Sequence, residues 1–260
     1  MQKAIYLLWE SKPQEPAQRR QRLLEELAPQ LVATGADGIQ VNICDDLATT
    51  PSPAPKPMFS EPFIAQVNVW TASGDIRQAC QDILTEAGFE LAGYQVDEWL
   101  YSDYGDNPHA KPRNWPDGER SPGILAVTLL RKPKRLSRDD WMRRWFGHQS
   151  PMSEWMQPRT RYVRHVVEEI LTPGAEAIDG IVEEDWPSGE HVTNSLLFYG
   201  AKNRLQLVRH MLIMLRSVTR ILNLWNITTV MMSEYFIKTP EAGLEPVNEQ
   251  MDSRRHSTTK

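Results

Sequence analysis

The chain has 260 residues, of which 40% are hydrophobic and 24% are charged, and its formal net charge is −5. This composition is typical of a folded globular protein, and it excludes collagenous, coiled-coil and disordered chains. The length predicts either one large domain or two domains of about 120–130 residues each.

Acidic and basic side chains are divided unequally between the two halves of the chain. Residues 1–122 carry 18 acids and 10 bases, whereas residues 123–260 carry 16 acids and 19 bases. A basic run at residues 131–144 would suit a phosphate backbone, but Asp139 and Asp140 interrupt it and the whole chain is acidic. We therefore expect no nucleic-acid partner.

The sequence predicts neither a membrane span nor a secretion signal. The longest uncharged run near the C-terminus, residues 221–233, has 13 residues, whereas a bilayer span needs about 20. The first apolar run is short and ends at Glu10, which does not fit a signal peptide. Because Cys44 and Cys80 are the only cysteines, no disulfide framework is expected. These features predict a reduced, cytoplasmic protein without a membrane partner.

Hydrophobic periodicity predicts four strands and two helices in the first half. Leu23, Leu27 and Leu31 follow the spacing of an amphipathic helix, while Ile39 and Val41 alternate with polar residues as in a half-buried strand. The predicted strands span residues 4–9, 38–44, 63–70 and 91–101, and the predicted helices span residues 15–32 and 74–87.

The second half repeats this order of elements. The predicted strands span residues 123–130, 160–171, 178–186 and 228–238, and the predicted helices span residues 137–149 and 203–223. Three further segments lack periodicity. Residues 49–62 contain five prolines and are expected to form a loop, residues 103–122 a linker, and residues 241–260 a flexible tail.

Both halves therefore have the β-α-β-β-α-β order of a ferredoxin-like unit. Because such a unit carries both helices on one face of its antiparallel sheet, the other face needs a cover. We predict an α+β protein with two tandem units, residues 1–102 and 123–240, whose sheets pack face to face as an α+β barrel. A cavity between the sheets would suit a small apolar ligand. Exposed strand edges at the two seams could pair with a second copy, so that both a monomer and a homodimer fit.

The most informative stretch is the predicted helix at residues 137–149. Ser137, with Asp140 three residues later, resembles a capping box at its start. Trp141, Trp145 and His148 then follow with heptad-like spacing, which predicts that His148 lies on the buried stripe near the end of the helix.

Motifs for metal, nucleotide or nucleophile chemistry do not occur in the sequence. No two of the six histidines lie within four residues of each other, and there is no phosphate loop, dinucleotide fingerprint or nucleophile elbow. We therefore expect no metal and no cofactor.

The run Leu-Ser-x-x-x-Trp-x-x-x-Trp-x-x-His-x-x-Pro-Met at residues 136–152 resembles the signature of EthD-domain proteins, a family in the dimeric α+β barrel superfamily. Two residues separate His148 from Pro151, where the family pattern has one, and Met152 replaces a leucine. The resemblance covers roughly residues 123–238. In the first half, residues 25–31 contain no histidine at the matching place, which predicts one site per chain.

The resemblance implies a small hydrophobic ligand, aromatic, polyketide-like or steroid-like, held between the sheets. His148 would be the general acid or base of a cofactor-independent lyase, isomerase or monooxygenase in a catabolic pathway. The candidates for contact with the ligand are aromatic residues, namely Trp145, Trp70, Tyr199 and Tyr235.

Two other interpretations stay open, because no second catalytic partner can be recognised near His148. One is a non-catalytic binding or accessory protein that supports an oxidative degradation system. The other is haem binding with His148 as the axial ligand. Arg161 and His165, on one face of a strand, are expected to be ordinary structural positions, and the acidic run Glu183–Asp185 is expected to face solvent.

Overall fold

The computed structural model describes residues 2–54, 62–223 and 226–241. The strands of the first half are β1 (Gln2–Glu10), β2 (Gly38–Ile43), β3 (Ala65–Thr71) and β4 (Phe89–Ser102). Its helical segments are α1 (Pro16–Gln21), η1 (Arg22–Leu27) and α2 (Ala28–Ala33), which run on from one another, and α3 (Gly74–Glu86). All of these elements start and end within two residues of the predicted positions.

The second half contains β5 (Ile124–Leu130), β6 (Arg161–Ile170), β7 (Gly180–Trp186) and β8 (Thr228–Lys238). Its helical segments are α4 (Arg138–Arg144), η2 (Trp145–Gln149), α5 (Ser150–Met156) and α8 (Arg204–Ile221). Two short helices, α6 (Gly189–Thr193) and α7 (Ser195–Phe198), were not predicted. The expected flexible tail lies outside the described residues, except for its first residue.

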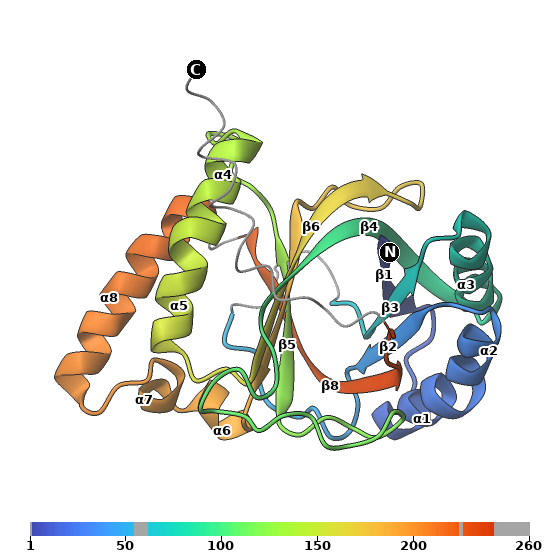
Figure 1. The fold of residues 1–260 in the computed structure, drawn as a ribbon, viewed down its shortest axis with the longest axis horizontal. Coiled ribbons are helices and arrows are strands. Elements are labelled where there is room, and N and C mark those ends of the chain that lie inside the picture. The colour runs from blue at the N-terminus through green and yellow to red at the C-terminus, as the bar shows by residue number, and fades with distance from the viewer. Residues whose placement is uncertain (1, 55–61, 224–225, 242–260) are drawn as a thin grey trace.

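The eight strands close into one antiparallel barrel in the order β1-β3-β2-β8-β5-β7-β6-β4 (Figure 1). Within each half the order is that of a ferredoxin-like unit, β4-β1-β3-β2 and β8-β5-β7-β6. The halves join where β2 pairs with β8 and β4 pairs with β6. The α+β barrel is therefore confirmed. The expectation of exposed edges at the seams is wrong for the described strands, because each of them has a neighbour on both sides.

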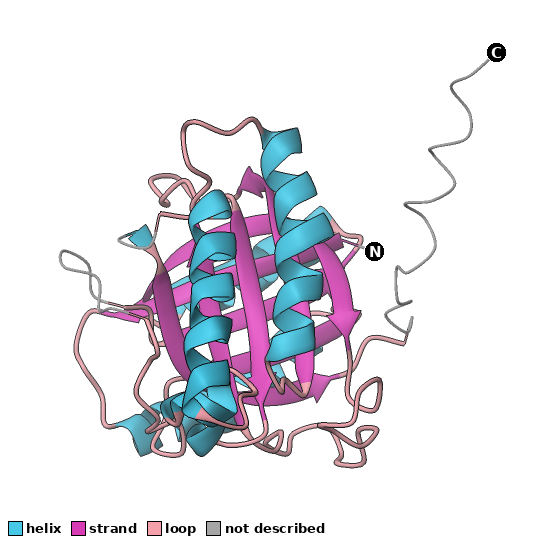
Figure 2. Cartoon of the chain, turned by 90° about the vertical axis from the view of Figure 1, so that its left-hand side faces the viewer, coloured by secondary structure: helices cyan, strands magenta, loops and turns pink. Residues whose placement is uncertain are grey.

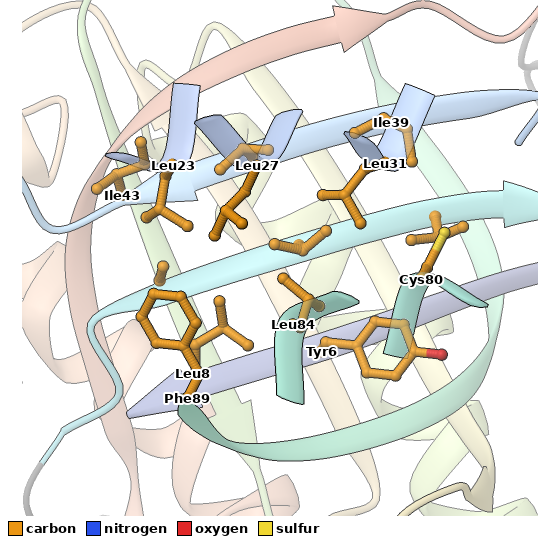
Figure 3. Packing of buried hydrophobic residues seen from close by; sticks show 14 of the residues in the cluster. Tyr6, Leu8, Leu23, Leu27, Leu31, Ile39, Ile43, Cys80, Leu84 and Phe89 are labelled. Atoms are coloured by element: carbon orange, nitrogen blue, oxygen red, sulfur yellow. The ribbon is translucent and has the colours of Figure 1, made fainter. Parts of the chain in front are cut away.

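Helices cover the barrel on two opposite sides (Figure 1). On one side, Leu23, Leu27 and Leu31 pack against the outward-facing residues of β1 and β2, and Cys80 and Leu84 of α3 complete this cluster (Figure 3). On the other side, α8 and the α4–η2–α5 helix lie next to each other across the strands (Figure 2). Both faces of the strands are therefore buried.

Each half contains a π-helical turn directly before an x-Pro pair. The amide of Ala28 bonds to the carbonyl of Leu23, and the amide of Ser150 bonds to the carbonyl of Trp145, each five residues back. Pro29 and Pro151 follow, and each lacks the N–H that a regular helix would use there. The wider turn lets the helix continue through the proline, so the helix predicted to end at Gln149 runs to Met156.

Candidate functional site

The interior of the barrel carries an unusual number of polar side chains. Successive residues of a strand point to opposite faces, so in β2 Ile39 and Val41 face the helices while Gln40 and Asn42 point inward. The inward-facing polar residues, buried or nearly so, are Lys3, Gln40, Asn42, Gln66, Asn68, Trp70, Glu98, Arg161, His165, Glu183, Asp185 and Glu234.

Lys3, Trp70, Glu98 and His165 form a compact cluster, here called the lysine–histidine cluster. The Lys3 ammonium lies 2.7 Å from Glu98 Oε1 and 2.8 Å from His165 Nε2. Trp70 Nε1 donates to Glu98 Oε2 at 2.8 Å, and its ring lies beneath the ammonium, 4.1 Å from Nζ to the centroid. Burial alone would raise the pKa of Glu98, but the ammonium holds it well below its usual range. The cluster is therefore built around an ion pair between Lys3 and Glu98.

The Lys3 ammonium, 2.8 Å from His165 Nε2, favours one tautomer of His165 over the one that would donate to Glu98 Oε1 at 3.5 Å. Because an ammonium only donates, His165 Nε2 must accept, and the ring proton then sits on Nδ1. Burial lowers the pKa of His165, and the nearby positive charge of Lys3 lowers it further. His165 is thus a neutral imidazole that presents an Nδ1–H donor inside the barrel.

Glu183 connects opposite walls of the barrel. Its Oε1 accepts from Gln66 Nε2 at 2.6 Å and from Asn68 Nδ2 at 2.7 Å, although β7 and β3 lie four strands apart in the eight-strand order. Burial would raise the pKa of Glu183, but the charges of Lys3 and Arg161 and the hydrogen bond from Asn68 lower it to about 2. Side chains therefore meet across the barrel at this level, where the sequence suggested a cavity.

Arg161 is the second cation inside the barrel, and it faces several carboxyl groups. Its Nη1 lies 3.1 Å from Glu234 Oε1, 3.6 Å from Glu183 Oε2 and 3.9 Å from Asp185 Oδ2. Two cations, Lys3 and Arg161, can balance only two of the four inward-facing carboxylates. Burial raises the pKa of both Asp185 and Glu234, and the charge on Glu234 raises that of Asp185 further, so this carboxyl pair takes up a proton.

Five buried polar atoms of this network have no hydrogen-bond partner among the described residues. Three are N–H donors: Asn42 Nδ2, Arg161 Nη2 and His165 Nδ1. The other two are oxygens, Gln66 Oε1 and Asp185 Oδ2. A buried polar atom without a hydrogen-bond partner costs roughly 1–3 kcal/mol of folding free energy. The barrel interior therefore contains polar atoms that could still bond to another molecule.

The rest of the barrel interior is apolar. The inward-facing residues of β5 and β8, together with those of β1 and β4, form a continuous hydrophobic cluster. Its members on β5 and β8 are Leu125, Val127, Leu129, Val230 and Met232. Polar and apolar walls therefore face the same interior.

The structure places His148 differently from the sequence-based prediction. Its side chain is exposed, because the π-helical turn η2 rotates it away from the stripe that buries Trp141 and Trp145. The expected burial of His148 is therefore wrong. Its role as general acid or base stays a prediction, since nothing at this position tests it.

Of the four predicted aromatic contact residues, Trp70 alone belongs to the lysine–histidine cluster. Trp145 is buried outside the barrel against Trp141 and Phe146. Tyr199 is half-buried, and its carbonyl bonds to His210 Nδ1. The Tyr235 hydroxyl donates to Asp45 Oδ2 on the outer side of β8 and lines a surface hollow with α1 and η1.

The acidic run of β7 does not face solvent as a whole. Glu183 and Asp185 are 0% and 1% exposed inside the barrel, whereas Glu184 points outward to Arg159. Arg161 and His165 share the inward face of β6, as predicted, but they belong to the polar network. Alternation had placed these residues on one face, but only barrel closure shows that this face is internal.

Within residues 2–54, 62–223 and 226–241, no three histidine, cysteine or carboxylate side chains are arranged to hold a metal ion. In the same ranges, no helix is both long and apolar enough to cross a bilayer.

No protein-family model matches the sequence, and no curated protein matches it. Among solved structures, an anthrone oxidase-like protein has a TM-score of 0.55 at 10% identity, covering 93% of this chain and 95% of that chain. A mutant chlorite dismutase from Candidatus Nitrospira defluvii gives 0.44 at 10% identity, with coverages of 91% and 92%. A protein provisionally assigned as a monooxygenase from Fusobacterium nucleatum gives 0.43 at 8% identity, with coverages of 91% and 92%.

The first of these similarities is one of fold. The chain has the fold of the dimeric α+β barrel proteins, with both halves of the barrel in a single polypeptide. At this level of identity, the similarity shows the fold alone.

Proposed function

We propose that the chain binds a small, largely apolar compound with an oxygen acceptor inside its barrel. The observation that carries this proposal is the group of three unpaired N–H donors on Asn42, Arg161 and His165. A carbonyl, phenolate or carboxylate oxygen would satisfy such donors, while the apolar wall of β5 and β8 would contact a ring.

The same groups supply the chemistry for proton transfer. A protonated Asp185 can donate to a substrate oxygen, and the Nδ1–H of His165 can stabilise an enolate or phenolate oxygen. We propose a cofactor-independent lyase, isomerase or monooxygenase acting on an aromatic, polyketide-like or steroid-like compound. This agrees with the resemblance to EthD-domain proteins, although the acid–base groups now proposed lie on β6 and β7.

A non-catalytic binding protein is the second candidate. It is favoured by the burial of Gln66, Asn68 and Glu183, which are all 0% exposed and bond across the barrel. A compound enclosed there would be shielded from water and released unchanged. Turnover by the purified protein separates this candidate from an enzyme.

The binding proposal is tested by thermal shift with aromatic, lactone, polyketide-like and steroid compounds, and with haem. A compound that binds the folded state raises Tm by mass action. We expect one oxygen-bearing ring class to stabilise the wild type, His165→Gln to lose most of that shift, and His148→Ala to keep it. A shift lost in His148→Ala but kept in His165→Gln would restore the sequence-based assignment. No shift with any class would leave the polar network with a structural role.

A further inference from the structure

The outward face of α8 is the most exposed apolar surface among the described residues. Leu205 is 82% exposed and Leu212 is 61% exposed, and other apolar residues at helical spacing join them. The exposed apolar residues of this helix are Leu205, Val208, Met211, Leu212 and Leu215. The opposite face of α8, with His210, Met214 and Ser217, packs toward the barrel. The exposed stripe is therefore not needed to hold α8 in place.

A tryptophan from the neighbouring helix extends this surface. Trp155 of α5 is 65% exposed, and its ring lies 5.1 Å from that of His210 on α8. Because α8 and the α4–η2–α5 helix lie next to each other across the strands (Figure 2), the surface is a broad two-helix layer. We call this layer, with the α8 stripe and Trp155, the α8 face.

All charged side chains of α8 are basic. The helix carries Arg204, Arg209, Arg216 and Arg220, all exposed, and no aspartate or glutamate. Arg143 on α4 is exposed as well, but it forms an ion pair with Asp140 of the same helix. An apolar stripe with a tryptophan and flanking arginines is the pattern of a helix that lies in the interface of a membrane.

The charges disfavour a second copy of this chain as the cover of the α8 face. Stacking two copies of α8 would bring arginines together without a carboxylate on either helix to balance them. Anionic headgroups complement the arginines, and the interfacial region accommodates leucine and tryptophan side chains.

We propose that the α8 face docks the protein reversibly on an anionic lipid surface, with Leu205, Leu212 and Trp155 entering the interface. This departs from the expectation of no membrane partner, which considered spanning segments and signals only. The docking is peripheral and does not depend on what binds inside the barrel.

The test is cosedimentation of the full chain with vesicles of phosphatidylcholine, with and without phosphatidylglycerol, at low and raised salt. We expect binding to the anionic vesicles only, weakened by salt. Leu205→Glu/Leu212→Glu should abolish it, and each of Arg209→Gln and Arg216→Gln should weaken it roughly fivefold. Leu47→Glu and Lys12→Gln, which change exposed side chains elsewhere, should bind as the wild type does.

Three results would overturn the proposal. One is equal binding, or none, to the two kinds of vesicle. Another is a wild-type protein that shows no preference for anionic lipid and is a dimer in light scattering, while the Leu205→Glu/Leu212→Glu variant is a monomer. That result would show that a second copy of the chain covers the α8 face. The third is preference for a synthetic Leu/Glu amphipathic helix over anionic vesicles, which would assign the α8 face to a protein partner.

Discussion

Glu183 is the residue on which the interior network depends most. It accepts bonds from Gln66 and Asn68 on the opposite wall and interacts with Lys3 and Arg161, the two cations inside the barrel. Alternation in β7 predicts that Glu183 and Asp185 share a face, but the sequence alone does not show that this face is internal. Polar residues that alternate with apolar ones usually face water. Here they fill a barrel whose outside is covered by helices.

Replacing Glu183 by Gln should be strongly destabilising. The amide oxygen could still accept from Gln66 and Asn68, but the NH2 would then face the N–H groups of Gln40 and Arg161 at the other position. Lys3 and Arg161 would also have one carboxylate fewer. Removing one member of a buried charge network costs about 3–5 kcal/mol. Chemical denaturation measures this loss. The control Glu169→Gln, at an exposed position of β6, should stay within about 0.5 kcal/mol of wild type, and equal losses would contradict the role of the network.

His165 should make stability depend on pH below neutrality. Its pKa is lowered in the folded state, so the unfolded chain takes up the proton first, below about pH 6.5. Stability is therefore lost as the pH falls from 7 toward about 5.5. His165→Gln should lose less stability over this range, as measured by denaturant unfolding at each pH. A parallel decline in both proteins would show that His165 does not titrate in this way.

At the scale of the helix, the two π-helical turns explain what periodicity could and could not predict. The positions of Trp141 and Trp145 follow from regular helical spacing, and both are buried. The prediction fails three residues later, at His148, because η2 closes with a bond five residues back. The signal was present in the sequence as Pro151, since a proline inside a continuing helix requires a local change in hydrogen bonding.

The cap of α4 was predicted from sequence and can be measured. Ser137 Oγ accepts a hydrogen bond from the amide of Asp140 at 3.1 Å. Ser137→Ala should cost roughly 1 kcal/mol, because this amide would lose its acceptor. Ser137→Asp, which keeps a side-chain acceptor, should restore most of the loss in thermal unfolding. If both variants unfold like the wild type, the cap contributes little to α4.

At the scale of the whole molecule, closure of the barrel joins the two ferredoxin-like units so that their sheets enclose one common interior. The order of elements predicted two sheets packed face to face. The pairing of β2 with β8 and of β4 with β6 could not be predicted, since it depends on register between segments far apart in sequence. The polar network inside the barrel likewise joins residues that are far apart in sequence, from Lys3 to Glu234. Such residues come together only when the chain is closed.

The close approach of helix and barrel wall can be tested at Gly180. A Cβ there would lie 2.9 Å from Trp145 Cη2 and 3.1 Å from the His165 carbonyl oxygen. Gly180→Ala should therefore destabilise the protein by about 1–3 kcal/mol through overpacking. Gly74→Ala is the control, because nothing lies within 4 Å of its Cβ position in the first turn of α3. A smaller loss at Gly180 than at Gly74 would contradict this packing.

The most direct test of the proposed interior site is NMR of protein labelled with ¹⁵N in histidine. We predict that His165 is neutral with its proton on Nδ1, held so by the Lys3 ammonium on Nε2. Addition of a ring compound selected by thermal shift should move this Nδ1–H resonance and leave that of His148 in place. A proton on Nε2, or a His165 resonance unmoved by every stabilising compound, would contradict a ligand site at the unpaired donors of the barrel.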